Sequence, residues 1–185
     1  MIDVNELRSG VTFELDDELF KVIEYSHHKP GRGKATIRTR VRNLRTGTVI
    51  EKSFISGDKV QDVRLDYRQC QFLYSDGRMY HFMDTDNYEQ PALTAEAIGD
   101  AVNYLKENME VKLTFYDSEP LDIDLPTTVD LEVVEAEMAV KGDTATGATK
   151  SVTTETGLSV QVPLFVERGD IIRVDTRSGE YVTRV

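Results

Sequence analysis

Hydrophobic and polar residues alternate along most of this chain, and short polar segments rich in Gly, Asp and Pro interrupt the alternation. Alternation of this kind places successive side chains on opposite faces of a β-strand. It predicts strands over residues 11–15, 19–25, 36–41, 49–55, 71–74, 79–83, 110–116, 121–125, 129–135, 152–154, 158–166, 171–175 and 180–185. We therefore expect an all-β protein of small barrels, in which few strand edges are exposed.

One segment, residues 94–108, has helical spacing instead. Its hydrophobic positions recur three or four residues apart, at Ile98, Ala101, Val102 and Leu105. Thr94 precedes them and suits an N-cap, because its hydroxyl can accept a hydrogen bond from a free backbone N–H of the first turn. This pattern predicts a single helix over residues 94–108.

Turn residues divide the chain into three units, which we place at residues 1–64, 65–126 and 127–185. Pro126 marks the second boundary. The last two units each contain about sixty residues and about five expected strands, which is the size of an oligonucleotide-binding (OB) barrel. The sequence therefore predicts three small β-barrel domains.

Charge is distributed unevenly along the chain. The net charge is -11, but residues 21–52 contain 9 basic and 2 acidic residues. Residues 65–125 have a net charge of -9, and residues 126–185 have a net charge of -4. Such asymmetry is a hint of nucleic-acid contact, and the acidic remainder should confine that contact to the basic segment.

Cysteine usage and hydropathy indicate the compartment. The chain has one cysteine, Cys70, so it cannot form an intrachain disulfide, as is usual in a reducing compartment. The first residues are charged, and no apolar run approaches the roughly 18 residues of a membrane span. We expect a cytoplasmic monomer that does not associate with a membrane.

The expected hairpin tip holds the most distinctive cluster of basic residues. It comprises Lys29, Pro30, Gly31, Arg32, Gly33 and Lys34. Pro30 restricts the backbone, the two glycines permit positive φ and leave room for a partner, and Arg32 has five donors in a planar fork. The tip therefore suits a strongly anionic partner such as RNA, although an ordinary exposed turn would have similar residues.

The segment after the tip has an arginine at every second position, at Arg38, Arg40 and Arg42. In a strand these side chains share one face at intervals of about 6.6 Å, while Ile37 and Val41 lie on the other face. No acidic residue occurs between positions 35 and 48. The pattern favours a surface that binds a phosphate backbone over an ordinary solvated strand face, which usually has charges of both signs.

No residue pattern indicates catalysis, a metal site or a cofactor. His27 and His28 are adjacent, so in a strand they point to opposite faces, and His81 stands alone. The chain has no Cys-x-x-Cys, no Gly-x-Ser-x-Gly and no phosphate-binding Gly-x-x-x-x-Gly-Lys motif. We therefore expect a binding protein and not an enzyme.

Several longer motifs are distinctive. The first is formed by Lys150, Val152, Gly157, Val160, Val162, Pro163, Val166 and Gly169. The second is Ile172-x-Val174-Asp175-Thr176-Arg177-Ser178-Gly179-Glu180-Tyr181. Others are Tyr80-x-Phe82-Met83-Asp84, Tyr88-Glu89-Gln90 and the Lys29-Pro30-Gly31-x-Gly33 tip. Together these motifs resemble the bacterial translation elongation factor P family, and the resemblance spans all 185 residues.

This resemblance implies a KOW/SH3-like N-terminal domain followed by two OB-fold domains, in an L-shaped arrangement similar to tRNA. It also implies a factor that binds the ribosome beside the peptidyl-tRNA, stimulates peptide bond synthesis and relieves stalling at consecutive prolines. The implied partners are the ribosome, ribosomal RNA and peptidyl-tRNA.

The resemblance also implies roles for individual residues. Arg32 would contact the end of the peptidyl-tRNA, with the other tip residues around it, and the three arginines of the following strand would bind neighbouring phosphates. The loop Gly142-Asp143-Thr144 would lie towards the small subunit and the codon. Many family members have a modified lysine at the tip, whereas Arg32 stands there in this chain, either bare or rhamnosylated by an arginine-modifying glycosyltransferase.

Three alternatives remain at this point. One is a paralogue similar to elongation factor P, with the same architecture. Another is a general single-strand-binding protein built on OB folds, which should have basic grooves with exposed aromatic side chains in its second and third units. The acidic charge of both units argues against it. The last is an enzyme with a site that no motif reveals.

Overall fold

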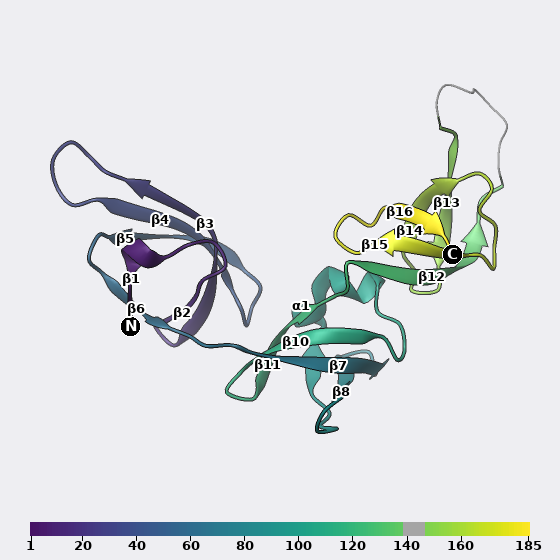
Figure 1. The fold of residues 1–185 in the computed structure, drawn as a ribbon, viewed down its shortest axis with the longest axis horizontal. Helices are drawn as coiled ribbons and strands as arrows, with labels where there is room; N and C mark the ends of the chain where they lie inside the picture. Colours follow the sequence, from purple (N-terminus) through teal and green to yellow (C-terminus); the bar gives the residue numbers. More distant parts are fainter. Residues whose placement is uncertain (139–146) are drawn as a thin grey trace. The chain divides into compact units, whose positions relative to one another are not determined.

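The computed structural model describes residues 1–138 and 147–185 and contains three β-sheets and little helix (Figure 1). The first sheet has the strand order β1-β6-β2-β3-β4-β5, the second β11-β10-β7-β8-β9 and the third β14-β13-β12-β15-β16. The predicted class, mostly β with one short helix, is confirmed. No helix within the described ranges is long and apolar enough to cross a membrane.

The first sheet is built from β1 (Ile2–Asp3), β2 (Thr12–Leu15), β3 (Glu18–His28), β4 (Thr36–Asn43), β5 (Val49–Ile55) and β6 (Lys59–Asp62). Alternate residues of these strands fill a core that includes Phe13, Phe20, Val22, Ile37 and Val41. The rings of Phe13 and Phe20 lie with centroids 5.6 Å apart. The long β3–β4 hairpin extends from this core and ends at the tip.

A two-residue turn joins β2 to β3. Asp16 and Asp17 both have positive φ, at 53° and 62°. Two positive φ values in succession define the turn whose twist matches that of a β-hairpin, and aspartate tolerates this conformation better than most residues. The predicted interruption after residue 15 is therefore correct.

The second sheet is formed by β7 (Asp66–Ser75), β8 (Met79–Asp84), β9 (Ala92–Thr94), β10 (Glu110–Tyr116) and β11 (Glu119–Asp124). The helix predicted over residues 94–108 is much shorter in the structure. Thr94 does cap it, but α1 covers only Ala95–Ile98, and a 3₁₀ turn, η2, follows over Gly99–Asn103. The prediction of one continuous helix was wrong because Gly99, at φ 55° and ψ -135°, ends the α-helical conformation.

The third sheet contains β12 (Thr128–Ala136), β13 (Thr149–Thr154), β14 (Ser159–Pro163), β15 (Ile171–Asp175) and β16 (Tyr181–Arg184). Its core is mainly β-branched and includes Val133, Val162, Ile172 and Val174. Tyr104, just after η2, is buried in the same core. The three strands that alternation did not predict, β1, β6 and β9, have only two to four residues.

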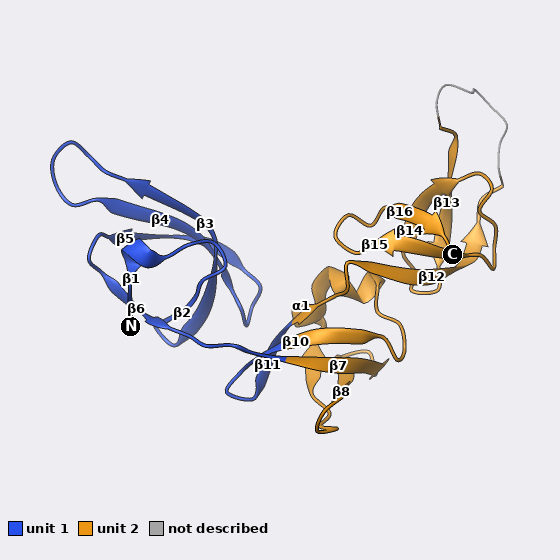
Figure 2. Ribbon diagram, viewed as in Figure 1, with its two compact units in different colours: residues 1–67, 114–122 blue, residues 68–113, 123–185 orange. Residues whose placement is uncertain are grey.

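The chain packs into two compact units, and the boundary between them does not coincide with the boundaries between the three sheets (Figure 2). Unit 1 contains residues 1–67 and 114–122, and unit 2 contains residues 68–113 and 123–185. The end of the β10–β11 hairpin belongs to unit 1 because Leu121 packs with Leu19 and Leu44. The three-domain division at residues 64 and 126 stays a prediction.

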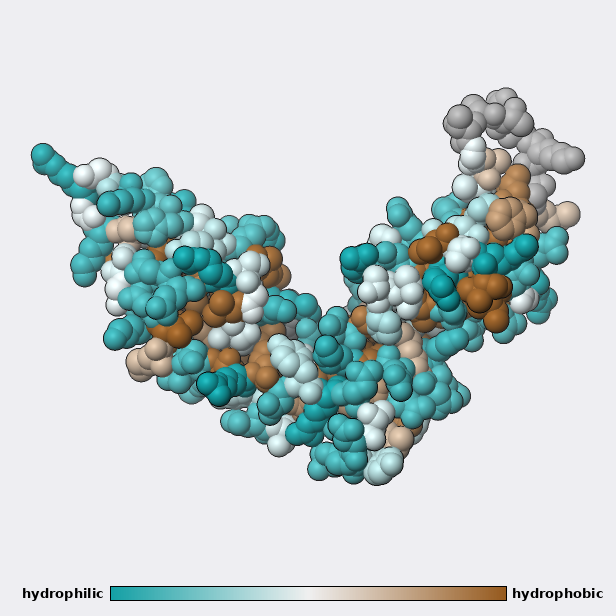
Figure 3. Space-filling view, viewed as in Figure 1, coloured by the Kyte–Doolittle hydropathy of each residue, from teal (hydrophilic) through white to brown (hydrophobic). Residues whose placement is uncertain are grey.

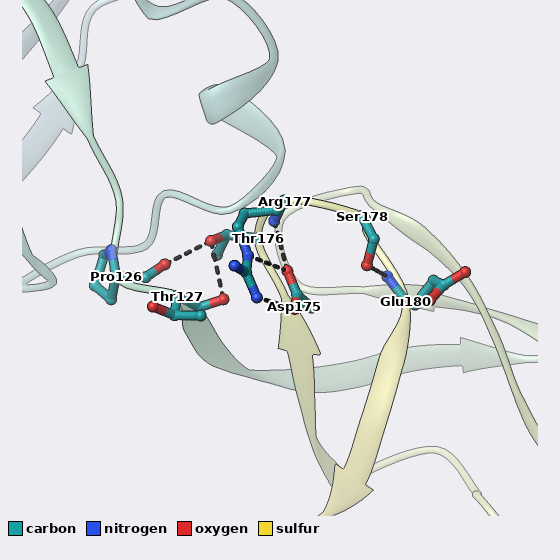
Figure 4. Close-up of polar contacts among 7 residues, drawn as sticks. All are labelled: Pro126, Thr127, Asp175, Thr176, Arg177, Ser178 and Glu180. Carbon is teal, nitrogen blue, oxygen red and sulfur yellow. Dashed lines mark hydrogen bonds and ion pairs between the residues drawn. The ribbon is translucent and has the colours of Figure 1, made fainter. Parts of the chain in front are cut away.

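Within unit 2, the turn between β15 and β16 holds the segment that leads into β12 (Figure 4). The Thr176 hydroxyl donates to the carbonyl oxygens of Pro126 and Thr127, at 2.5 and 3.1 Å. The Arg177 guanidinium donates from Nη2 to Oδ2 of Asp175 at 3.2 Å and lowers the pKa of Asp175. The backbone N–H of Arg177, which donates to Oδ1 at 2.8 Å, lowers it further. These motif residues therefore stabilise the turn.

Candidate nucleic-acid interface

The tip lies between the end of β3 at His28 and the start of β4 at Thr36 (Figure 1). All of its residues are exposed except Pro30, which is half-buried. Both glycines permit positive φ, and Gly33 adopts it, at 106°, whereas Gly31 does not. A Cβ at either glycine would meet no atom within 4 Å, so the space beside both glycines is open.

Arg32 is the outermost cation of this hairpin. In the described part of the chain its guanidinium makes no hydrogen bond or ion pair, so all five of its donors can face a partner. Lys29 and Lys34 flank it without any carboxylate in the loop. In the space-filling view, hydrophilic side chains cover this end of the first sheet (Figure 3). The loop is therefore a local concentration of positive charge.

The structure places the three arginines of β4 on one face, as predicted. Arg38 and Arg40 are exposed and Arg42 is half-buried, whereas Ile37 and Val41 of the same strand are buried in the core. Hydrogen bonding to β3 on one side and to β5 on the other gives each arginine two cross-strand neighbours. Those neighbours, which the sequence pattern did not identify, decide the charge of the face.

Arg40 has an acidic residue on each side. It pairs in register with Glu24 of β3 and Glu51 of β5, and its Nη1 lies 3.1 Å from Oε1 of Glu24. The expectation of an arginine stripe free of acid holds along residues 35–48 but is wrong across the sheet. The reason is that sequence distance does not reveal which strand residues become neighbours.

Arg38 has a different environment. Its register partners are Ser26 on β3 and Ser53 on β5, and neither is charged. A surface hollow of about 430 Å³ lies over this part of the sheet. It is lined by Glu24, Tyr25, Ser26, Arg38, Thr39, Arg40, Glu51 and Ser53.

Outside the basic hairpin, the polar clusters of the described residues have structural explanations. His81 Nε2 lies 3.0 Å from Oδ2 of Asp76, and its ring stacks on Tyr74 with centroids 4.6 Å apart. Burial raises the pKa of Cys70 to about 11, so it is not poised as a nucleophile. Among the residues that the structure describes, no three His, Cys, Asp or Glu side chains cluster as metal ligands would.

The predicted small-subunit loop, Gly142, Asp143 and Thr144, lies outside the described residues. Of the predicted site, the structure therefore describes the tip and the β4 arginines. The residues that sequence reasoning missed, Glu24, Glu51, Ser26 and Ser53, belong to the two neighbouring strands. A correct strand register would have been the only signal for them.

Comparison with known proteins gives consistent matches along the whole chain. Three models of elongation factor P match it: the KOW-like domain at residues 3–60, the OB domain at residues 65–123 and the C-terminal domain at residues 129–184. Proteins named elongation factor P from Moorella thermoacetica and Thermotoga maritima are 49% and 52% identical over 184 residues, with full coverage of both chains.

A likeness among solved structures concerns the fold alone. A chain described as eukaryotic translation initiation factor 5A from Methanococcus jannaschii aligns with a TM-score of 0.55 and 24% identity. The alignment covers 67% of the present chain and 91% of that chain. Over the aligned two thirds of the chain, the fold is therefore shared with a protein of low sequence identity.

Proposed function

Because the chain belongs to the elongation factor P family, we propose that it is a translation elongation factor that acts on the ribosome beside the peptidyl-tRNA. In this role it stimulates peptide bond synthesis and relieves stalling at consecutive prolines. The chemistry belongs to the ribosome, and this chain supplies contacts and no catalytic group.

The exposed Arg32 at the end of the β3–β4 hairpin is the observation that carries the residue-level proposal. Proline is a constrained nucleophile, and a polyproline nascent chain favours unproductive geometry. A cation that orders the end of the peptidyl-tRNA lowers the entropic part of that barrier. Its donors also stabilise the negative charge of the tRNA terminus.

The remaining contacts follow the same logic. The β4 face that carries Arg38, Arg40 and Arg42 is the part of the sheet that contacts RNA phosphate near the tip, because phosphate contacts fix the orientation of a bound protein. Which of the three arginines binds a phosphate depends on its cross-strand neighbours. Gly142, Asp143 and Thr144 form the contact towards the small subunit. The three-domain division at residues 64 and 126 separates the KOW-like unit, which has the tip, from the two OB-fold units.

Translation of a triple-proline reporter in a purified system tests the proposal. Adding the protein should speed synthesis of the reporter, and Arg32→Ala should remove most of the gain. The control variant is Arg78→Ala, since Arg78 is an exposed arginine at a different hairpin turn. Synthesis of a reporter without consecutive prolines should be unaffected by the wild-type protein and by both variants. The proposal fails if the wild-type protein leaves the triple-proline reporter unchanged.

Arg32 can act in this role bare or rhamnosylated by an arginine-modifying glycosyltransferase. Rhamnosylation adds hydroxyl groups to the guanidinium and extends its reach by one sugar. Mass spectrometry of the tryptic peptide that contains Arg32, from protein made in its native host, separates the two states. An added deoxyhexose identifies the modified form, and an unshifted mass identifies the bare arginine.

A further inference from the structure

The outer face of the β3–β4–β5 sheet is organised in rows of three cross-strand neighbours. Starting near the tip, the rows are His28–Thr36–Ile55, Ser26–Arg38–Ser53, Glu24–Arg40–Glu51 and Lys21–Arg42–Val49. Residues paired in register point to the same side of a sheet, with Cβ atoms about 4.5–5.5 Å apart. The affinity of each β4 arginine for phosphate therefore depends on its two neighbours in the same row.

The row of Arg40 repels anions. Two carboxylates flank one guanidinium, so the row has a net charge of -1, and Glu24 Oε1 already occupies Nη1 of Arg40 at 3.1 Å. A phosphate that approached Arg40 would have to displace Glu24 and would lie close to Glu51. The negative charges of the phosphate and of these glutamates would repel each other at such short range, so this row disfavours phosphate binding.

The row of Arg38 has the opposite character. Ser26 and Ser53 are small, so they leave the guanidinium of Arg38 accessible from both sides, and each contributes a hydroxyl donor. Within the described residues, the Arg38 side chain makes no hydrogen bond or ion pair. The next row towards the tip, which contains His28 and Thr36, has no acidic residue.

The chemistry of this row fits a phosphodiester. A guanidinium presents parallel N–H donors that match two phosphate oxygens, and the charge-assisted bonds are about twice as strong as neutral ones. The Arg38 row and the Arg40 row both line the surface hollow of about 430 Å³. A phosphate in this hollow therefore meets hydrogen-bond donors at the Arg38 row and carboxylates at the Arg40 row.

We propose that the Ser26–Arg38–Ser53 row is a seat for a single RNA backbone phosphate, and that the Glu24–Arg40–Glu51 row excludes the next phosphate. This inference rests on the proposed function and refines it. Three equivalent arginines would let an RNA strand slide along the face, whereas one seat beside one repulsive row fixes the strand in a single register. The register in turn fixes the distance between the bound RNA and Arg32 at the tip.

Two matched variants test this asymmetry. Arg38→Gln and Arg40→Gln remove the same charge from exposed positions of the same strand. Ribosome affinity should fall about tenfold for Arg38→Gln, as expected for the loss of a charge-assisted phosphate contact. It should fall only about two- to threefold for Arg40→Gln, which removes no phosphate contact but leaves Glu24 and Glu51 without their cation. Glu24→Gln should strengthen binding. Thermal unfolding of each variant verifies that the fold is retained.

The serine hydroxyls have a test of their own. Ser26→Ala with Ser53→Ala should weaken ribosome binding about threefold in the wild-type background. In the Arg38→Gln background the same pair should have almost no effect, because residues that share one ligand are not additive. Additive losses in the two backgrounds would contradict a shared seat.

The binding assay, run on ribosomes with and without tRNA in the peptidyl site, distinguishes whether the bound phosphate belongs to tRNA or to ribosomal RNA. A loss for Arg38→Gln only on ribosomes with tRNA in the peptidyl site assigns the phosphate to tRNA. An equal loss on ribosomes without tRNA assigns it to ribosomal RNA. Both outcomes support the seat.

Other outcomes overturn it. Equal losses for Arg38→Gln and Arg40→Gln would mean a uniform stripe, and no loss for either would mean that the face does not bind phosphate. The proposed function is judged separately by the triple-proline reporter. If wild-type protein stimulates that reporter while the two glutamine variants bind equally, the seat fails and the proposed function stands.

Discussion

Arg32, Arg38 and Arg40 have the same side chain, but their neighbours give them different chemistry. Arg32 stands in a loop without carboxylates, Arg38 lies between two serines, and Arg40 lies between two glutamates. A guanidinium cannot lose its proton in a protein, so only its surroundings set its affinity for phosphate. Residue identity alone is therefore a weak guide to which arginine binds RNA.

Asp76 shows the same dependence on neighbours in the β7–β8 turn. Its carboxylate accepts hydrogen bonds from the backbone N–H of Met79 at 2.8 Å and of Arg78 at 2.9 Å, and it pairs with His81. These contacts lower the pKa of Asp76 from 3.8 to about 2. A lowered pKa in the folded state means that the ionised group stabilises the fold above pH 3.8, and that this contribution is lost as the pH falls towards 2.

We predict that Asp76→Asn lowers the thermal midpoint near neutral pH, and that the difference from wild type shrinks between pH 3.8 and about pH 2. Calorimetry across this range measures both midpoints. The matched control is Asp86→Asn, because the Asp86 carboxylate is exposed and makes no hydrogen bond in the described part of the chain. A difference for Asp76→Asn that stays constant with pH would contradict the assignment.

At the scale of elements, hydrophobic alternation located thirteen of the described strands, although it covered only residues 71–74 of β7 (Asp66–Ser75). It placed β10 and β15 correctly, because their core-facing positions keep a period of two. It did not identify β1, with two residues, which is too short to show any period. The helix was overestimated because Ala101 and Leu105 keep helical spacing beyond Gly99, where the backbone leaves the helix.

The candidate site was predicted to a similar extent. The tip and the shared face of the β4 arginines follow from local sequence, since a turn motif and a period of two are local properties. The neighbours Glu24 and Glu51 do not, because they lie on other strands and become neighbours of Arg40 only through strand pairing. For Glu24, the β3–β4 pairing also includes a register shift between Val22 and Glu24. A one-residue error in register moves every side chain to the other face, so cross-strand chemistry needed the structure.

The end of the β10–β11 hairpin makes polar contacts with the first sheet inside unit 1. Arg45 forms two hydrogen bonds with Glu119, each of 3.3 Å, and its Nη1 donates to the Asp17 carbonyl oxygen at 2.9 Å. Tyr116 donates its hydroxyl to Glu14 at 3.2 Å, which raises the pKa of Tyr116. The hairpin is therefore attached by directional contacts as well as by the packing of Leu121.

We predict that Arg45→Glu and Glu119→Arg each destabilise the protein, and that the double variant recovers part of the loss. The recovered coupling should be about 0.5 kcal/mol, because exposed ion pairs contribute about 0.2–1 kcal/mol. Recovery should be incomplete, since the carboxylate introduced by Arg45→Glu cannot donate a hydrogen bond to the Asp17 carbonyl oxygen. Denaturant unfolding of the four proteins in the cycle measures the coupling.

A mismatched pair is the control for this cycle. Arg45→Glu combined with Glu110→Arg, a change at an exposed residue elsewhere on β10, should recover nothing. If both double variants recover equally, the effect is one of overall charge and not of the Arg45–Glu119 contact. High salt should reduce the recovery in the genuine pair, because the pair is exposed to solvent.

At the scale of the whole molecule, the charge distribution limits where RNA can bind. The chain has 33 acidic and 22 basic residues, yet 9 of the basic residues lie within residues 21–52. Most of the remaining surface therefore repels a phosphate backbone. This arrangement should favour a specific ribosomal contact over binding to any exposed RNA, because electrostatic repulsion lowers the affinity for wrong partners.

Neutralising part of the acidic surface tests this selectivity. Glu96, Asp100 and Glu107 are exposed residues of unit 2, and none of their carboxylates is paired in the described ranges. We predict that converting all three to their amides tightens binding to polyuridine several-fold, measured by fluorescence anisotropy. Stimulation of the triple-proline reporter should not change, since the tip and the β4 arginines are intact.

Raising the salt concentration should abolish the gain in polyuridine affinity, because the Debye length falls to about 3 Å at 1 M. A variant that binds polyuridine no better than wild type at low salt would show that the acidic surface does not set selectivity, and that specificity resides in the hairpin face alone.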